Sequence, residues 1–485
     1  MSDQERNETP SAGTVAARGE GAAAGGPEMA AAEPADPAGP TICLWLRLQG
    51  GCWDQRLHNT LKKIIAQAPP LLGAVGKEFS CELDLSVDKY FSLTLSHASG
   101  FFAESGLELD FRNPKIHLSG IPKAGFDGPL TFLIRDDGSD RMLSLEKPLY
   151  IAADPRTLWR DLPVEDDEGY PVPDEAVEAR FLDLTGKVFL AASCRGRYHA
   201  HAARPRDDSF ALDIDPDTGW HFIAVADGAG SAKFARKGSE LACATVIRSL
   251  RADLAAQDED IAGQEDRLRD WKRQCAAGGD SDPERDRDFN SGLKFDAIVH
   301  RAVYAAYQAI SGEARRKGAA VRDYHTTLLC AAFRKFSFGY FFLCYWVGDG
   351  AMALYNGNGG VLVPGIPDGG EFAGQTRFLT MKEEIEAEAI RRRTRCAFAE
   401  DFEALLLMTD GVSDPFFPAE KDVAGAENWH AFWQKTLRRG FEDNPGCPRV
   451  FDASLPPEER ARALRKWLDF WSRGNHDDRT LVLVL

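Results

Sequence analysis

The sequence predicts an α+β protein that consists of a tail, a small all-β module, a linker and a larger mixed domain. Residues 1–40 are rich in Ala, Gly, Pro and Glu and contain no aromatic residue. Residues 41–165 show short stretches of alternating apolar and polar side chains between Gly and Pro turns. Residues 166–180 form a linker rich in Asp, Glu and Pro, and residues 181–485 alternate apolar runs with charged, helix-like stretches.

The tail is expected to be disordered, because its composition buries too little apolar surface to offset the entropy cost of ordering. The whole chain has 58 Lys and Arg against 75 Asp and Glu, a net charge of −17. This acidity argues against nucleic-acid binding, which needs clustered cations. No apolar run approaches the roughly 20 residues of a membrane-spanning helix. Without a signal-peptide pattern or a Cys-x-x-Cys pair, a cytoplasmic location is expected.

The small module is predicted to be a β-sandwich. Strand-like alternation is clear in residues 79–86 and 91–96, and regular strands with Gly and Pro turns are typical of such folds. Residues 120–132 resemble a segment of bacterial immunoglobulin-like repeats, so an immunoglobulin-like accessory module is expected. One amphipathic helix is expected over residues 56–66. The module carries no catalytic constellation, and its expected role is to recruit a protein partner or substrate.

In the larger domain, three apolar runs end in the dipeptide Asp-Gly, at Asp227, Asp349 and Asp410. A buried strand that ends in this way places a carboxylate at the edge of a sheet, and the glycine allows a sharp turn. A single Asp-Gly is more often an ordinary β-turn. Three of them after long apolar strands favour a shared carboxylate cluster, and the acidic pairs Asp207-Asp208 and Asp477-Asp478 strengthen this interpretation.

Carboxylates gathered in this way repel one another unless cations neutralise their charge. Hard oxygen ligands without His or Cys favour Mg²⁺ or Mn²⁺ over Zn²⁺. Two such ions can bind one water, lower its pKa and stabilise the charge that develops when this water attacks phosphorus. The pattern therefore indicates phosphoester hydrolysis by a metal-activated water.

The order of these motifs resembles the metal-dependent type 2C (PPM) family of Ser/Thr protein phosphatases, and its bacterial subgroup in particular. The resemblance implies an α/β/β/α sandwich over residues 181–485, with the metals at one edge. It also implies hydrolysis of phosphoserine and phosphothreonine in the targets of a Ser/Thr kinase. The motifs that carry the resemblance are Arg206-Asp-Asp-Ser-Phe210, Val225-Ala-Asp-Gly-Ala-Gly230, Thr326-Thr-Leu-Leu329, Val347-Gly-Asp-Gly350, Met408-Thr-Asp-Gly-Val-Ser-Asp414 and Asp477-Asp-Arg-Thr480.

The resemblance implies a role for each matching residue, with two or three Mn²⁺ or Mg²⁺ ions. Asp227 would bridge two metals, and Gly228 would bind through its backbone carbonyl. Asp410 and Asp477 would complete the shell of the first metal, so catalysis would depend on them and on Asp227. The remaining expected metal residues are Asp207 and Asp208 near the second ion, and Asp349 and Asp414 at a third site shared with Asp410.

Two positions depart from the family pattern. The phosphate-binding arginine usually lies five residues before the second carboxylate, where this chain has alanine, and Arg204 or Arg206 would take its place. The histidine that often follows Asp-Gly as general acid is replaced by Ala229. His199, His201 or a metal-bound water would then protonate the leaving group.

Two other functions stay open. The changed arginine and histidine positions allow a non-catalytic, phosphatase-like signalling scaffold, although retention of the main carboxylates argues against it. The second alternative is a metal-dependent hydrolase of a small phosphoester or nucleotide. A comparison of phosphopeptides with nucleotides as substrates would separate that activity from a protein phosphatase.

Overall fold

The computed structural model divides the chain into two compact units, Met1–Asp154 and Pro155–Leu485. The division falls before residue 165, and strand β9 (Glu175–Leu182) begins inside the predicted linker 166–180. The predicted tail, residues 1–40, lies outside the described residues. No helix in the described part of the chain is both long and apolar enough to cross a membrane. The structure describes residues 42–49, 55–87, 92–98, 100–136, 141–164, 169–170, 174–182, 185–277, 294–356, 360–368, 376–441 and 444–485.

The first unit contains a five-stranded sheet of order β2-β8-β7-β1-β4 and a three-stranded sheet of order β3-β6-β5. Most pairings are antiparallel, but β1 pairs parallel with β7 and β2 pairs parallel with β8. The strands are β1 Ile42–Gln49, β2 Leu71–Ala74, β3 Phe79–Asp84, β4 Ser92–Ala98, β5 Leu107–Arg112, β6 Lys115–Gly120, β7 Phe126–Asp136 and β8 Met142–Ala152.

This unit is α+β rather than all-β. Helix α1 (Gln55–Gln67) covers the predicted amphipathic stretch and buries Leu57, Leu61 and Ile65 in the core shared with both sheets. The spacing of four residues places these side chains on one helix face. A short helix α2 (Phe101–Ser105) follows β4. The all-β description was wrong because the core needs the apolar face of α1, and the likeness to immunoglobulin-like repeats stays a prediction.

The second unit is built on two antiparallel sheets. The first has the order β16-β15-β18-β21-β10-β9 and the second the order β11-β12-β13-β14-β17. The strands after β9 are β10 Lys187–Cys194, β11 Ser209–Ile214, β12 His221–Ala226, β13 Leu328–Phe336, β14 Gly339–Val347, β15 Ala351–Tyr355, β16 Val361–Leu362, β17 Thr394–Ala399, β18 Ala404–Met408, the small pair β19 Gly440–Phe441 and β20 Asn444–Pro445, and β21 Arg479–Val484.

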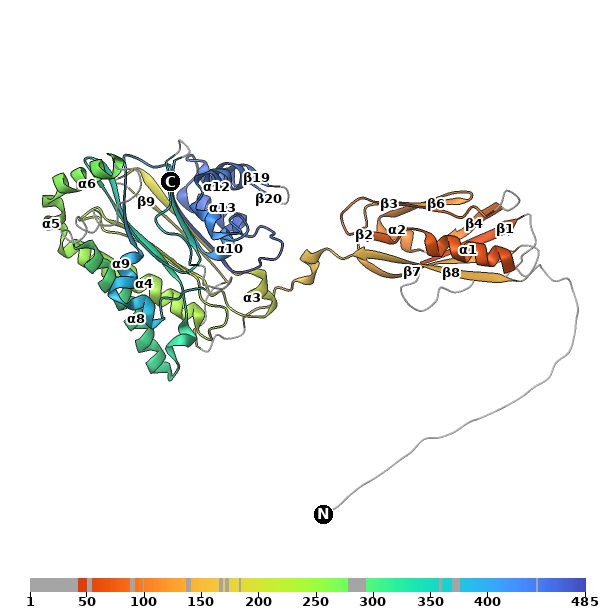
Figure 1. Cartoon of the computed structure of the whole chain (residues 1–485), viewed down its shortest axis with the longest axis horizontal. Coiled ribbons are helices and arrows are strands. Elements are labelled where there is room, and N and C mark those ends of the chain that lie inside the picture. The colour runs from red at the N-terminus through yellow and green to blue at the C-terminus, as the bar shows by residue number, and fades with distance from the viewer. Residues whose placement is uncertain are drawn as a thin grey trace, which may run out of the picture. The chain divides into compact units, whose positions relative to one another are not determined.

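Helices cover the outer faces of both sheets (Figure 1). Helices α4 and α8 pack on the five-stranded sheet, and α12 and α13 lie on the side of the six-stranded sheet. The helices are α3 Arg197–His201, α4 Ala235–Ala256, α5 Asp258–Gly263, α6 Glu265–Ala277, α8 Phe295–Lys317, α9 Ala387–Arg392, α10 Asp410–Ser413, α11 Glu420–Ala424, α12 Ala426–Ala431 and α13 Pro457–Leu468.

Strand β12 shows how the sequence produces these layers. Its side chains alternate between two cores, because successive residues of a strand point to opposite faces. Phe222 and Ala224 pack against the helices α4 and α8, whereas Ile223 and Val225 pack between the two sheets. The sequence of a strand that is buried on both faces is a nearly continuous apolar run, and β12 has such a sequence. The unit is thus two stacked sheets between two layers of helices.

Candidate metal centre

The predicted acidic residues lie next to the ends of strands. Asp227 follows β12, Asp349 lies two residues after β14, and Asp410 lies two residues after β18. Asp207-Asp208 precede β11, and Asp477-Asp478 precede β21. Strand β11 pairs antiparallel with β12, and β18 with β21. The start of one strand therefore lies beside the end of its neighbour, which brings the acidic residues of each pair of strands to the same edge.

Asp227, Asp349 and Asp410 form the first group of the site. Each offers one carboxylate oxygen, and the three oxygens lie within 4.8 Å of one another. Thr376 Oγ1 donates a hydrogen bond to Asp349 Oδ2 at 2.5 Å. Among the described residues, no hydrogen-bond donor reaches the buried Oδ1 atoms of Asp208, Asp349 and Asp410. The group therefore has oxygen lone pairs that only a ligand or water can satisfy.

The pKa values of these carboxyls reflect their crowding. Burial raises the pKa of Asp227 well above its usual value, and the charges of Asp410 and Asp208 raise it further. Burial also raises the pKa of Asp410, with Asp349 and Asp477 adding to the effect. Burial raises the pKa of Asp208 to about 7. Buried like charges of this kind are costly unless a cation neutralises them.

Asp414 lies at the rim of the same group. Its backbone N–H donates to the carbonyl of Asp410 at 2.9 Å, at the end of the short helix α10. Burial, together with the charges of Asp349 and Asp477, raises the pKa of Asp414 to about 6. The role of Asp414 at a third metal site, with Asp349 and Asp410, stays a prediction.

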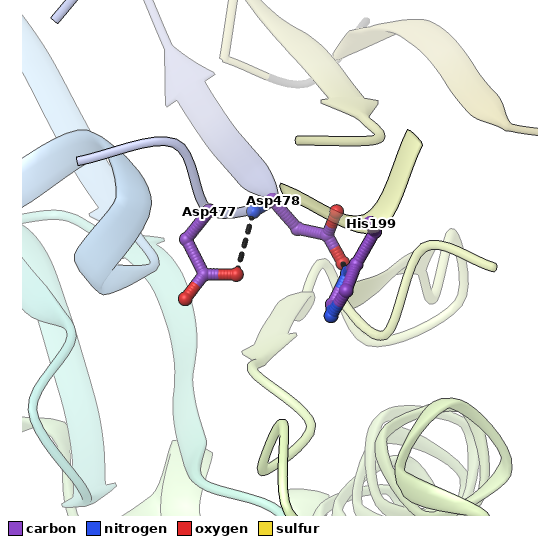
Figure 2. Close-up of side chains that lie close together, drawn as sticks. All are labelled: His199, Asp477 and Asp478. Carbon is purple, nitrogen blue, oxygen red and sulfur yellow. Dashed lines mark hydrogen bonds and ion pairs between the residues drawn. The ribbon is translucent and has the colours of Figure 1, made fainter. Parts of the chain in front are cut away.

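His199, Asp477 and Asp478 form the second group (Figure 2), again with ligand atoms within 4.8 Å of one another. The carboxylate of Asp478 turns toward His199, whereas that of Asp477 is turned away from the imidazole. Asp477 Oδ1 accepts a hydrogen bond from the backbone N–H of Asp478 at 2.9 Å. Asp477 rather than Asp478 is therefore the member of this pair that is free to face the first group.

Asp478 joins two distant segments of the chain. Its Oδ1 accepts from the backbone N–H of Gly196 at 2.6 Å, and its Oδ2 accepts from that of Asp207 at 2.5 Å. His199 Nδ1 donates to the same Oδ2 at 2.8 Å. Burial alone would raise the pKa of Asp478, but His199 and the two backbone donors hold it below its usual value. Asp478 is thus a fully bonded anion that fixes the loop carrying Asp477.

His199 and Arg204 surround Asp207 with positive charge. His199 Nε2 lies 3.6 Å from Asp207 Oδ2, and Arg204 Nη2 lies 3.4 Å from the same oxygen. Burial would lower the pKa of His199, but the charges of Asp478 and Asp207 raise it to about 9. Asp207 is thus paired with cations, whereas Asp208 keeps a free oxygen. Of this acidic pair, Asp208 has the stronger case as a metal ligand.

The two candidate phosphate-binding arginines differ in their surroundings. The Arg204 side chain is 33% exposed, and its Nη1 donates to the carbonyl of Gly230 at 2.8 Å, beside the loop that follows Asp227. Arg206 is only 7% exposed, and its Nη1 donates to Ser193 Oγ and to the carbonyl of Asp208. Arg206 is therefore a buried bridge between strands, and its burial argues against a role in binding phosphate.

The two predicted general-acid histidines differ in their exposure, because His199 is buried and His201 is exposed. His199 is 2% exposed and uses both ring nitrogens on carboxylates. His201 Nδ1 accepts from the backbone N–H of Arg160 at 3.1 Å, and its ring lies 5.6 Å from that of Trp159. His201 packs against the segment that opens this unit, and its role as a general acid stays a prediction, whereas the burial of His199 between carboxylates argues against that role.

The glycines of two Asp-Gly pairs are required by close packing. A Cβ atom on Gly228 would lie 2.8 Å from the carbonyl oxygen of Asp207 and from the backbone of Ala235. A Cβ atom on Gly411 would lie 1.8 Å from the carbonyl oxygen of Asp478. The turn after each strand is thus pressed against the loop that carries the next acidic pair, which is what brings the carboxylates together.

The donor set of this edge fits divalent metal ions. It consists of carboxylate oxygens, three of them buried without a donor among the described residues. Burial, and then repulsion between the carboxylates, raises the pKa values of Asp227 and Asp410. Mg²⁺ and Mn²⁺ prefer such hard oxygen ligands. The residues best placed to hold them are Asp208, Asp227, Asp349, Asp410 and Asp477.

Three residues of the quoted motifs support the site in roles that were not predicted from the sequence. Thr409 Oγ1 and Thr480 Oγ1 donate to Asp208 Oδ2 at 2.8 and 2.7 Å, which leaves only Oδ1 free. The third is Asp478, which clamps the Asp477 loop. Thr409 directly precedes Asp410, and Thr480 directly follows Asp478-Arg479. Their position next to the acidic residues is the sequence feature that could have indicated a supporting role.

Three solved structures illustrate the similarity to known proteins. RsbX in complex with magnesium is 14% identical, with a TM-score of 0.31 over 64% of this chain and 98% of that chain. The catalytic domain of the serine/threonine phosphatase PstP with two manganese ions is 18% identical, with a TM-score of 0.31 over 64% and 98%. The S. agalactiae serine/threonine phosphatase is 12% identical, with a TM-score of 0.32 over 61% and 98%. No curated protein sequence matches the chain.

The family assignment rests on a different comparison. The family model described as protein phosphatase 2C matches residues 195–469, which is more than half of the chain. The matched range includes Asp227, Asp349 and Asp410, the residues of the first carboxylate group. The resemblance recognised from the motifs is thereby confirmed, and the chain belongs to the protein phosphatase 2C family.

Proposed function

We propose that the protein is a metal-dependent phosphatase that hydrolyses phosphoserine and phosphothreonine in proteins. The observation that carries the proposal is the convergence of carboxylate oxygens from Asp227, Asp349 and Asp410, where Asp349 and Asp410 each keep a buried Oδ1 without a donor among the described residues. Two or three Mn²⁺ or Mg²⁺ ions bound there would activate a water and neutralise the charge that develops on phosphorus. Membership in the protein phosphatase 2C family supports the same reaction.

The residues of the chain have distinct roles in this proposal. Asp227, Asp410 and Asp477 hold the ions on which catalysis depends, and Asp478 fixes the loop of Asp477. Arg204 binds the substrate phosphate, because its guanidinium is partly exposed beside the carboxylates and is held there through the carbonyl of Gly230. A guanidinium suits this role because its planar donors match phosphate oxygens.

We further propose that the substrates are products of a Ser/Thr kinase and that the N-terminal unit recruits a protein partner. Leu72 of β2 and Tyr150 of β8 are register partners in the sheet of that unit. Both side chains are exposed, at 66% and 48%. We propose that this exposed pair belongs to the contact surface, because contiguous exposed apolar patches mark protein interaction sites.

The test measures hydrolysis of p-nitrophenyl phosphate, a phosphothreonine peptide and nucleotides in the presence of Mn²⁺, Mg²⁺ or EDTA. We expect hydrolysis of the first two substrates to require metal and to be lost in Asp227→Asn. The exposed Asp260→Asn on α5 is the matched control and should behave as wild type. Arg204→Met should raise KM for the peptide with a smaller effect on kcat.

Two outcomes would contradict the proposal. Faster hydrolysis of nucleotides than of phosphopeptides would identify a small-phosphoester hydrolase. No hydrolysis of any substrate by folded, metal-loaded protein would identify a non-catalytic scaffold.

A further inference from the structure

A short backbone pairing places His325 opposite the turn that follows Asp227. Gly228 and Thr326 form an antiparallel bridge. On either side of it, the N–H of Ala229 donates to the carbonyl of His325 at 2.9 Å, and the N–H of Thr327 donates to that of Asp227 at 2.8 Å. In an antiparallel pair, this hydrogen-bond pattern sets His325 directly opposite Ala229.

The register of this antiparallel pairing determines on which face of the two paired segments the imidazole of His325 lies. Residues directly opposite one another in an antiparallel pair have their side chains on the same face, as do residues two apart on one strand. His325 therefore shares a face with Ala229 and with Asp227. Phe378 gives independent support, because it packs against the small apolar cluster that contains Ala229 and its ring stacks on that of His325 at 5.0 Å and 12°.

The imidazole of His325 is held in place through Nδ1, and its other nitrogen, Nε2, takes no part in that contact. Its Nδ1 shares a hydrogen bond of 2.5 Å with Oγ1 of Thr380, which is itself 5% exposed. Among the described residues, Nε2 has no hydrogen-bond partner, and the side chain is half-buried. The contact with Thr380 and the stacking on Phe378 fix the ring, so Nε2 is the atom that remains for a substrate.

We propose that His325 is the catalytic acid that protonates the leaving serine or threonine oxygen, a role that rests on the phosphatase function proposed above. As water attacks phosphorus, the P–O bond to the side chain breaks and its electron pair stays on the leaving oxygen. The proton on Nε2 of the imidazolium passes to that oxygen and releases the hydroxyl product. The proton that the attacking water loses then reprotonates the imidazole of His325. The net reaction therefore converts the phosphoester and water into an alcohol and phosphate.

The charge of the substrate favours the protonated imidazole. Burial lowers the pKa of His325 in the free protein. A phosphate ester carries up to two negative charges, and an anion close to a histidine stabilises its protonated form. Substrate binding therefore prepares the acid, while the stacking on Phe378 and the bond to Thr380 keep its position.

The test compares two substrates that differ in their need for a proton. The alkoxide that leaves a phosphothreonine peptide needs protonation, whereas the nitrophenolate that leaves p-nitrophenyl phosphate does not. We expect His325→Ala and His325→Asn to lower kcat for the peptide about 100-fold or more, the usual range for loss of general acid–base catalysis. For p-nitrophenyl phosphate we expect a change of less than about 3-fold, since that reaction lacks the step.

Controls separate this inference from the proposed function. Asp227→Asn should abolish hydrolysis of both substrates, and His300→Ala, which alters a histidine that stacks on Tyr304 of α8, should change neither. His325→Asn keeps a polar group for Thr380, so its folding is checked by thermal unfolding. Equal losses on both substrates, or an unchanged peptide rate, would overturn the inference alone. Wild-type protein that is inactive on both substrates would overturn the proposed function and the inference with it.

Discussion

Replacing Asp227 with asparagine should stabilise the metal-free protein and remove its response to metal. Oxygens of Asp227, Asp349 and Asp410 lie within 4.8 Å of one another. At this distance and an effective dielectric constant of about 20, two full charges repel by about 3.5 kcal/mol. Asp227→Asn removes two such pairs. The raised pKa values of Asp227 and Asp410 mean that the charges are partly neutralised by protons, so we expect a net gain of about 1–3 kcal/mol.

Urea unfolding in EDTA and in saturating Mn²⁺ measures both effects. In EDTA the variant should unfold at a higher urea concentration than wild type. In Mn²⁺ at 100 times its dissociation constant, wild type should gain about 2.7 kcal/mol, and the variant should gain much less. The exposed Asp260→Asn should follow wild type in both conditions.

The dependence on pH adds a second check. The gain of Asp227→Asn in EDTA should shrink as the pH falls, because the carboxyls of wild type then carry protons and no longer repel. A variant less stable than wild type in EDTA at neutral pH would refute the idea that these carboxylates strain the metal-free protein.

Two further predictions concern stability. His221 is 1% exposed, and burial lowers its pKa to about 4, whereas the unfolded value is about 6.5. The unfolded state therefore binds the proton first as the pH falls, and about 3 kcal/mol of stability should be lost between pH 6.5 and 4. His221→Phe should remove this part of the acid sensitivity in urea midpoints measured against pH, and an unchanged profile would contradict it. Gly411→Ala should cost about 3 kcal/mol or more, because its Cβ would meet the backbone of Asp478 at 1.8 Å. The Cβ of the matched Gly312→Ala in α8 would meet none of the described residues within 4 Å beyond its own helix backbone, so this variant should gain about 1 kcal/mol in the same urea assay.

The strands and the gathering of the main carboxylates could be predicted from the sequence. Asp227, Asp349 and Asp410 each follow a long apolar run, and such a run identifies a buried strand without knowledge of its partners. The recurrence of Asp-Gly after three such strands was the basis for expecting one shared carboxylate cluster. Helix α1 could also be predicted from the sequence, because its apolar residues recur with the period of an α-helix.

The roles of the arginines and histidines could not be predicted from the sequence. Arg204 and Arg206 are two residues apart, yet one lies beside the carboxylates at the surface and the other is buried against Ser193. The difference depends on which neighbouring segments cover each side chain. The same holds for His199 and His201, which lie on one short helix and face different parts of the chain.

The sequence by itself determined the local features: which stretches form strands, where they stop and which carboxylates stand at their ends. The tertiary structure alone decided which of those groups are free and which are already bonded. Asp478 binds the backbone of Gly196, and His325 stands opposite Ala229, across long separations in the chain. Contacts of this kind depend on the register of strand pairs, and a shift of one residue would turn each side chain to the other face.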